Sequence, residues 1–278
     1  MNKLSVEEKV RVVACLVEGN SLRSTVRMTG IHRTTIQKLL VELGAVCSAY
    51  QDKIFRNLKC QRLQCDEIWS FCGAKEKNAS AEKKQQGWGD VWTWTALDAD
   101  TKLIPCWLVG DRGAGSAYHF IHDLKDRLAN RIQLTTDGHG VYVLAVKDAF
   151  GEEIDFAQLQ KIYGIDRDSS KQAQIRYSPA QCMGAKKAVI CGQPEAHHIS
   201  TSYSERSNLT MRMQMRRFTR LTNGFSKKLA NHEAAIALHF MHYNFARIHQ
   251  TLRVTPAMEA GLSDHVWTIE EIVALLDG

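Results

Sequence analysis

Apolar residues in the first 45 positions recur at intervals of three or four, which is the spacing of an amphipathic helix. The pattern predicts a first helix over residues 6–17, preceded by Ser5 and Glu8 in a capping-box arrangement. It predicts a second short helix over 21–29 and a third over 31–44, each ended by a glycine. Three short helices with a glycine-containing turn before the last are typical of a helix-turn-helix.

The outward face of the third predicted helix carries polar side chains that suit DNA. Arg33, Thr34, Gln37 and Lys38 point away from the apolar stripe and can reach base edges or phosphates. The alternative is a generic three-helix unit whose outer face is merely polar. Residues 30–40 resemble a helix-turn-helix recognition segment, which favours the first interpretation.

From residue 61 onward the apolar spacing changes, and predicted strands and helices share the chain. Residues 63–72, 91–98 and 103–109 are predicted strands that short connections would join in an antiparallel meander. An amphipathic helix over 116–130 then leads to a β-rich fourth strand over 132–136. This succession predicts an α/β fold.

The following part of the chain is predicted to be mainly helical around one basic segment. Helices are expected over 141–150, over 205–221 and from a cap at Ser226 to about 247. Residues 166–202 mix short extended pieces with lysines and an arginine, which indicates an inserted basic loop.

We therefore divide the chain into a helix-turn-helix domain over 1–45, a linker over 46–60 and a larger α/β domain over 61–250. Residues 251–278 form a tail with a helix expected to pack on the body or on a second subunit. Hydrophobic residues make up 44% of the 278 positions, which supports a sizeable core.

Positive charge is concentrated in two regions. The net charge is +6, and residues 1–60 carry ten Lys and Arg against five Asp and Glu. Residues 205–228 carry seven against one. Clustered positive charge indicates an anionic partner, and nucleic acid is the commonest one.

The cysteines and the apolar segments exclude several classes of protein. No two of the eight cysteines have Cys-x-x-Cys spacing, so a zinc finger is not expected. The chain has no apolar signal segment and no apolar run of about 18 residues, so no membrane span is expected. We expect reduced thiols in a cytoplasmic protein.

Three acids on separate predicted elements are candidates for a metal site. Asp66 interrupts a strand, Asp137 follows a strand end, and Glu205 begins a helix whose period places Asn208, Arg212 and Arg216 on the same face as Glu205. Taken singly, each acid is more simply a turn or surface residue, and Glu195 is a rival to Glu205. If the two strands are neighbours, the acids converge and repel one another unless cations are present.

Two Mg²⁺ ions roughly 3.5–4 Å apart would offset that repulsion, because carboxylate oxygens are the ligands Mg²⁺ prefers. One ion would activate water or a 3′-hydroxyl, and the other would stabilise the leaving oxygen of a phosphodiester. Such chemistry needs no side-chain nucleophile.

Several segments, in the same order along the chain, resemble DDE transposases of the insertion sequence one family. They are residues 65–71, 135–139, 204–212, 216–228, 243–253 and 255–257. The resemblance implies an RNase H-like fold with a mixed five-stranded sheet and helices on both faces. It also implies that Asp66, Asp137 and Glu205 are the catalytic triad and the ligands of two Mg²⁺ ions, with Mn²⁺ as a substitute.

The resemblance implies a DNA transposase that binds the terminal inverted repeats of its element and joins cleaved 3′-hydroxyl ends to target DNA. A homodimer or larger assembly would hold the two ends, in the bacterial cytoplasm and on the nucleoid when bound to DNA. His139 would position the metal ligands or the DNA strand without binding the ions itself. The side chains expected at DNA are Arg33, Thr34, Gln37, Lys38, Arg206, Asn208, Arg212, Arg216, Arg220, Lys227 and Lys228.

The chain departs from this family in two respects. It lacks the zinc finger that precedes the helix-turn-helix in the family's best-known members. The 68 residues from Asp137 to Glu205 exceed the spacing in retroviral-type integrases, which fits an insertion. Two other hypotheses remain open: a non-catalytic helix-turn-helix repressor or domesticated relative, and a structure-selective nuclease.

Other signals favour structural roles. His197 and His198 could bind a metal, but adjacent histidines are expected to point apart. Trp92 and Trp94 should share one face of a strand, where core packing is favoured over base stacking.

Overall fold

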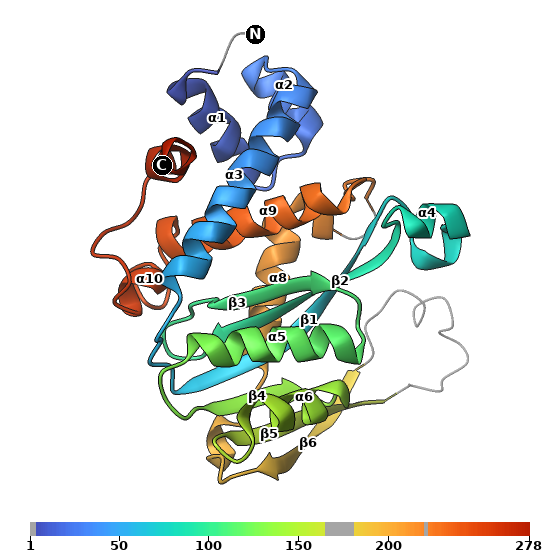
Figure 1. The fold of residues 1–278 in the computed structure, drawn as a ribbon, viewed down its shortest axis with the longest axis vertical. Helices are drawn as coiled ribbons and strands as arrows, with labels where there is room; N and C mark the ends of the chain where they lie inside the picture. The colour runs from blue at the N-terminus through green and yellow to red at the C-terminus, as the bar shows by residue number, and fades with distance from the viewer. Residues whose placement is uncertain (1–3, 165–180, 220–221) are drawn as a thin grey trace.

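The computed structural model describes residues 4–164, 181–219 and 222–278. A six-stranded mixed sheet forms its centre, in the order β3-β2-β1-β4-β5-β6 (Figure 1). The strands are β1 (Arg62–Cys72), β2 (Gly89–Asp98), β3 (Cys106–Gly110), β4 (Gln133–Asp137), β5 (Asp155–Gly164) and β6 (Gln181–Cys191).

The strand directions divide the sheet into a meander and a parallel part. β1, β2 and β3 are antiparallel neighbours, so the expected meander is confirmed. β4 lies parallel to β1 on its other side, and β5 lies parallel to β4. The predicted mixed sheet with helices on both faces is therefore present.

The predicted number of five strands is wrong, because part of the expected basic insertion over 166–202 is a sixth strand. β6 pairs antiparallel with β5 and extends the edge of the sheet. Its middle residues Gly184, Ala185, Lys186 and Lys187 have low strand propensity, so the local pattern does not reveal it. Backbone hydrogen bonds to β5 stabilise this strand despite its low propensity.

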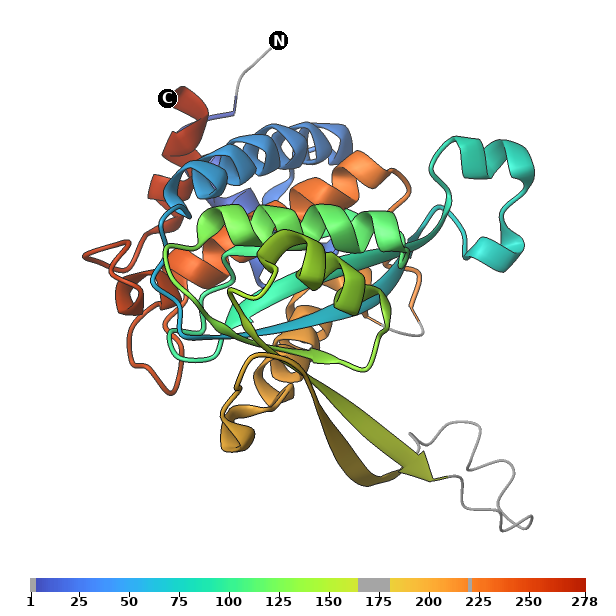
Figure 2. The same cartoon turned by 60° about the horizontal axis from the view of Figure 1, so that its bottom comes forward.

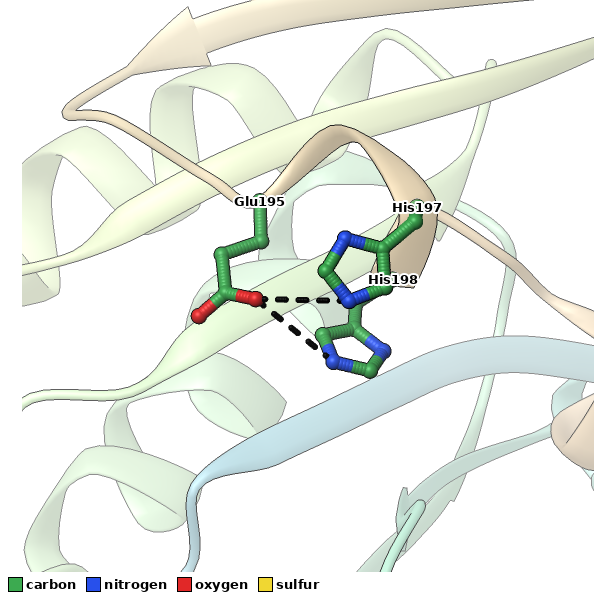
Figure 3. A group of neighbouring side chains, drawn as sticks. All are labelled: Glu195, His197 and His198. Carbon is green, nitrogen blue, oxygen red and sulfur yellow. Dashed lines mark ion pairs between the residues drawn. The ribbon is translucent and has the colours of Figure 1, made fainter.

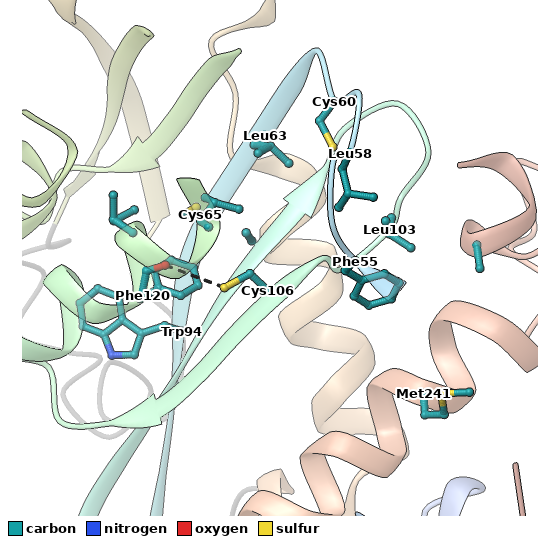
Figure 4. Close-up of a cluster of buried hydrophobic side chains, with 14 of the residues drawn as sticks. Phe55, Leu58, Cys60, Leu63, Cys65, Trp94, Leu103, Cys106, Phe120 and Met241 are labelled. Carbon is teal, nitrogen blue, oxygen red and sulfur yellow. Dashed lines mark hydrogen bonds between the residues drawn. The ribbon is translucent and has the colours of Figure 1, made fainter. Parts of the chain in front are cut away.

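Helices cover both faces of the sheet. α5 (Ala114–Arg127) and α6 (Val141–Phe150) lie on one face, and α8 (Ser202–Gln214) and α9 (Leu229–Met241) lie on the other (Figure 1). Trp94, Phe120 and Cys106 are buried on the α5 face (Figure 4). On the opposite face Ile68 packs in a second buried cluster with side chains of α8 and α9.

The three N-terminal helices form as predicted except for the end of the third. They are α1 (Val6–Val17), α2 (Leu22–Thr29) and α3 (Arg33–Ile54). Ser5 and Glu8 make the capping box, and Ser21 caps α2.

The predicted helix end at Gly44 is wrong, because α3 continues through that residue and through position 45, the expected domain boundary. Glycine inside a helix costs only about 1 kcal/mol, and here the missing side chain allows α3 to lie against α9. A Cβ at Gly44 would lie 2.5 Å from both Cα and Cβ of Ala234.

The predicted C-terminal helix bounds also need correction. The helix expected to reach 221 ends at Gln214, because the chain turns to bury Phe218 under the sheet. Ser226 does not cap α9: its hydroxyl is bound by Arg217 and His232. α9 continues as the π-helix η5 (His242–Ala246), so the helical stretch ends close to the expected position.

The remaining elements are short. They are η1 (Glu76–Asn78), α4 (Ala81–Gln85), η3 (Ala196–His198), η4 (Arg216–Phe218), α10 (Pro256–Glu259), α11 (Ile269–Ala274) and η6 (Leu275–Asp277). The tail helix expected after residue 251 corresponds to α11, which packs against α1. All eight cysteines are free thiols. No helix among the described residues has both the length and the apolarity that a membrane span requires.

Gly44→Ala is expected to destabilise the protein by about 1–3 kcal/mol, because the new methyl group overlaps Ala234. Gly115→Ala on α5 is the matched control, since no described residue beyond its own helical turn comes within 4 Å of the added Cβ. The control should be neutral or up to about 1 kcal/mol more stable. Urea titration measures both free energies of unfolding. Equal stability of the two variants would show that α3 and α9 do not meet at Gly44.

Candidate active site

The register between β1 and β4 brings Asp66 and Asp137 together. The two strands are parallel, and Cys65 opposite Thr136 is their last pair. Asp66 and Asp137 follow immediately, where β4 ends. Carboxylate oxygens of Asp66, Asp137 and Glu67 lie within 4.8 Å of one another. Acids 71 residues apart in the sequence therefore share one site.

Helix α8 is attached to β1 by two buried amide side chains. Gln64 Oε1 accepts hydrogen bonds from the backbone N–H of Tyr203 at 2.9 Å and of Ser204 at 3.1 Å. One turn later, Asn208 Nδ2 donates to Asp66 Oδ2 at 2.8 Å. Gln64 and Asp66 alternate to the same face of β1, so the helix crosses that strand in a fixed orientation. Glu205 lies between the two attachment points.

Glu205 faces the same cavity but lies outside the group of oxygens within 4.8 Å. Its Oε2 forms a 2.5 Å ion pair with Lys161 Nζ of β5, and its Oε1 accepts a 2.6 Å hydrogen bond from Thr201. In this conformation a lysine therefore takes the position at Glu205 that a cation would need.

The cavity has a volume of about 840 Å³ and is lined by charged and polar side chains. The charged ones are Asp66, Glu67, Arg112, Asp137, Lys161, Glu205 and Arg212.

Two residues at the centre of the site were not predicted. Glu67 is 7% exposed and accepts a 3.2 Å hydrogen bond from Arg112, whose Nη2 lies 3.7 Å from Asp137. Glu67 Oε1 has no hydrogen-bond partner among the residues that the structure describes. The pair Asp66–Glu67 was a signal in the sequence, since two consecutive acids in a strand are unusual. Arg112 lies in the loop before α5 and gave no such signal.

Burial and like charge act on the two consecutive acids. Burial, together with the charges of Glu67 and Asp137, raises the pKa of Asp66 to about 7. Burial, with the charge of Asp137, also raises the pKa of Glu67, against opposing effects of Tyr142 and Arg112. The ionised forms are therefore unfavourable in the protein alone. A hard divalent cation fits these oxygen ligands and would supply the missing positive charge.

The structure places His139 beside Asp137. The carboxylate of Asp137 accepts a 2.9 Å hydrogen bond from the backbone N–H of His139. The His139 ring stacks on Trp94, which is fully buried, with centroids 6.2 Å apart. Core packing of Trp94 is therefore as expected, whereas Trp92 is only half-buried.

The side chains expected at DNA are distributed over several surfaces. Arg33, Thr34 and Lys38 are exposed on α3, and Gln37 is half-buried beside them. Among the other side chains expected at DNA, Arg206, Arg216, Lys227 and Lys228 are exposed. Arg212 lines the cavity, and Arg220 lies outside the described residues. Asn208 is 5% exposed, and its amide is engaged by Asp66.

Arg216 does not share a helix face with Glu205, because α8 ends before it. The predicted alignment of Glu205, Asn208, Arg212 and Arg216 on one face therefore holds only for the first three.

The rival acid Glu195 belongs to a different cluster. Its Oε2 lies 3.5 Å from His197 Nε2 and 3.6 Å from His198 Nε2 (Figure 3). The two rings lie 3.8 Å apart, so the expectation that they point apart is wrong. Glu195 bonds Gln133 at the first residue of β4, whereas Asp137 is the last. It is therefore displaced from the acids by the length of that strand.

A metal ion is disfavoured at the Glu195 cluster. Arg62 contacts both ring nitrogens of His198, at 2.5 and 2.8 Å. A ring that accepts from a guanidinium has no lone pair to spare for a metal, and the arginine charge repels a cation.

No family model and no curated protein matches the chain. It is similar to a chain of a solved structure described as "Cryo-EM structure of piggyBac transposase synaptic complex with hairpin DNA". The TM-score is 0.42 at 10% identity, covering 99% of this chain and 72% of that one.

The raised pKa of Asp66 predicts a pH-dependent stability in metal-free protein. The unfolded state loses the Asp66 proton near pH 4 and the folded state near pH 7. Stability therefore falls as pH rises between these values. Asp66→Asn removes this loss, so in EDTA the variant should exceed wild type by about 2–4 kcal/mol at pH 8 and by little at pH 4.

Chemical denaturation at several pH values measures this difference. Asp126→Asn, at an exposed position on α5, is the control and should leave the pH dependence unchanged. A constant difference between Asp66→Asn and wild type across the pH range would contradict the environment assigned to Asp66.

Proposed function

We propose that the chain is a DDE-type DNA transposase with an RNase H-like catalytic domain. One observation carries the proposal: adjacent parallel strands place Asp66 beside Asp137, and a helix bonded to the same strand presents Glu205 to the same cavity. Three of the six transposase-like segments, residues 65–71, 135–139 and 204–212, fall on β1, the end of β4 and α8. If the three acids were unrelated surface residues, there would be no reason for all three to face one cavity.

The residues around the cavity divide into metal ligands and positioning groups. Asp66 and Asp137 would hold one divalent cation, and Asp66 with Glu205 a second. When bound, two Mg²⁺ ions, or Mn²⁺ in their place, activate the attacking water or 3′-hydroxyl and stabilise the leaving oxygen. Asn208 fixes the carboxylate of Asp66.

Cationic side chains complete the DNA-binding part of the proposal. Arg112 and Arg212 line the cavity and are placed to attract the phosphates that flank the scissile bond. Arg33, Thr34, Gln37 and Lys38 on α3 would read or position the element ends. The exposed cations Arg206, Arg216, Lys227 and Lys228 would contact the DNA backbone, as would Arg220. Two ends must be held together, so a dimer or larger assembly follows.

A non-catalytic DNA-binding protein is the second candidate. One observation favours it: Glu205 is paired with Lys161 and lies outside the close group of acids. A protein that only binds DNA would have no need to release that pair.

Asp66→Ala, Asp137→Ala and Glu205→Ala should each reduce strand joining to background, because each removes a proposed metal ligand. Binding of the element end should survive in all three. Labelled duplexes that carry the inverted repeat flanking the gene measure joining and binding separately, with Mg²⁺ or Mn²⁺. Undiminished joining by any one variant would remove that residue from the triad. Binding without cutting by wild type would favour the non-catalytic candidate.

Lys161→Met should tighten Mn²⁺ binding about tenfold, which corresponds to about 1.4 kcal/mol. The reason is that a cation must displace Lys161 from Glu205. Electron paramagnetic resonance of free Mn²⁺ measures the affinity. Lys147→Met, which removes an exposed charge from α6, controls for net charge and should leave the affinity nearly unchanged. Equal affinities of both variants would show that Glu205 does not bind the ion.

A further inference from the structure

Beyond Asp66 the central strands carry a row of aromatic side chains. β1 and β2 extend past α5 towards α4 (Figure 2). Trp69 on β1 lies directly opposite Trp92 on β2, so both side chains project from one face of the sheet. Trp94, opposite Glu67, is fully buried under the helices, whereas Trp69 and Trp92 are only half-buried.

Two further rings continue the row. Phe71 follows on the same face of β1, 5.7 Å from Trp69 between ring centroids. Phe225, brought in by pairing of Ser226 with the end of β1, lies 4.7 Å from Phe71. We call Trp69, Phe71, Trp92 and Phe225 the aromatic surface.

Cations lie over three of these four rings. The guanidinium of Arg112 is 4.6 Å from the Trp92 ring, Lys75 Nζ is 5.5 Å from Trp69, and Lys227 Nζ is 5.8 Å from Phe225. Such contacts stabilise exposed aromatic rings only modestly. A row of half-buried rings with positive charge above it is complementary to a ligand that has both flat faces and negative charge.

Arg112 connects the aromatic surface with the candidate active site. The same guanidinium that lies over Trp92 bonds Glu67 and approaches Asp137 to 3.7 Å. Glu67, Trp69 and Phe71 share one face of β1, whereas Asp66 projects from the other. A strand with its phosphate near Glu67 and Asp137 would therefore pass Arg112 and reach the rings.

We propose that the aromatic surface binds unpaired nucleotides of a DNA strand adjacent to the phosphate in the cavity. The inference rests on the proposed function and names the state of its substrate. Bases of an unpaired strand expose their faces, which stack on aromatic rings without regard to sequence, while Lys75, Lys227 and Arg112 contact the phosphates. Paired bases within a duplex keep their faces covered and cannot stack in this way. The proposal therefore requires a frayed or distorted end.

The test compares single-stranded and duplex DNA in EDTA, where no cleavage can occur. The probes are a mixed-sequence oligonucleotide of about 16 nucleotides and its blunt duplex. Trp69→Leu and Trp92→Leu keep apolar bulk but remove the stacking face. Each should weaken single-strand binding about tenfold and leave duplex binding nearly unchanged.

Phe225 lies outside the sheet, so Phe225→Leu can replace a strand variant that proves unstable. It should also weaken single-strand binding and leave duplex binding nearly unchanged. Tyr118→Leu removes an exposed ring from α5 and should change neither affinity. Unchanged single-strand binding in the folded variants would overturn the inference, as would equal losses for both probes.

The outcomes separate this inference from the proposed function. If the protein binds single strands selectively but never joins DNA, the proposed transposase function is refuted and the proposed role of the aromatic surface stands. Joining by wild type, with single-strand binding indifferent to Trp69, Trp92 and Phe225, would refute only the aromatic surface.

Discussion

The attachment of helix α8 to strand β1 determines the geometry of the candidate site. Gln64 satisfies two N–H groups at the helix N-terminus that have no partner within the helix, and Asn208 bonds Asp66 one turn later. Gln64 is 3% and Asn208 5% exposed, so water cannot replace these bonds and their loss would leave buried polar groups unpaired. The bonds join residues 139 to 142 positions apart, and Glu205 takes its position from them.

This arrangement gathers more negative charge than the protein alone favours. Burial and neighbouring carboxylates raise the pKa of Asp66. Two cationic side chains pair with the other acids of the site. Arg112 bonds Glu67 and approaches Asp137, while Lys161 pairs with Glu205. In the proposed complex, metal ions would bind the acids and DNA phosphates would bind the cations. Under the proposed function, Arg112 and Lys161 neutralise these acids in the protein alone, and metal ions would replace them.

Local sequence patterns predicted the elements of this site but not their contacts. Capping at Ser5 and Ser21 and the strand around Asp66 follow from spacing and residue type, and so do the positions of Asp137 and Glu205 at element ends. Gly44 was misjudged because a glycine that ends a helix and one that admits a neighbouring helix look alike in sequence. Lys161 and Arg112 were missed because their importance comes only from long-range packing. β6 was missed because its pairing with β5 outweighs its poor strand propensity.

A crystal structure of the chain with Mn²⁺ and an oligonucleotide would test the convergence of the three acids most directly, since anomalous scattering locates the ions. The expected result is two ions roughly 3.5–4 Å apart, with Asp66 between them, Asp137 on one and Glu205, released from Lys161, on the other. Ions bound elsewhere, or Glu205 still paired with Lys161 in a metal-loaded complex, would contradict a two-metal site at these residues.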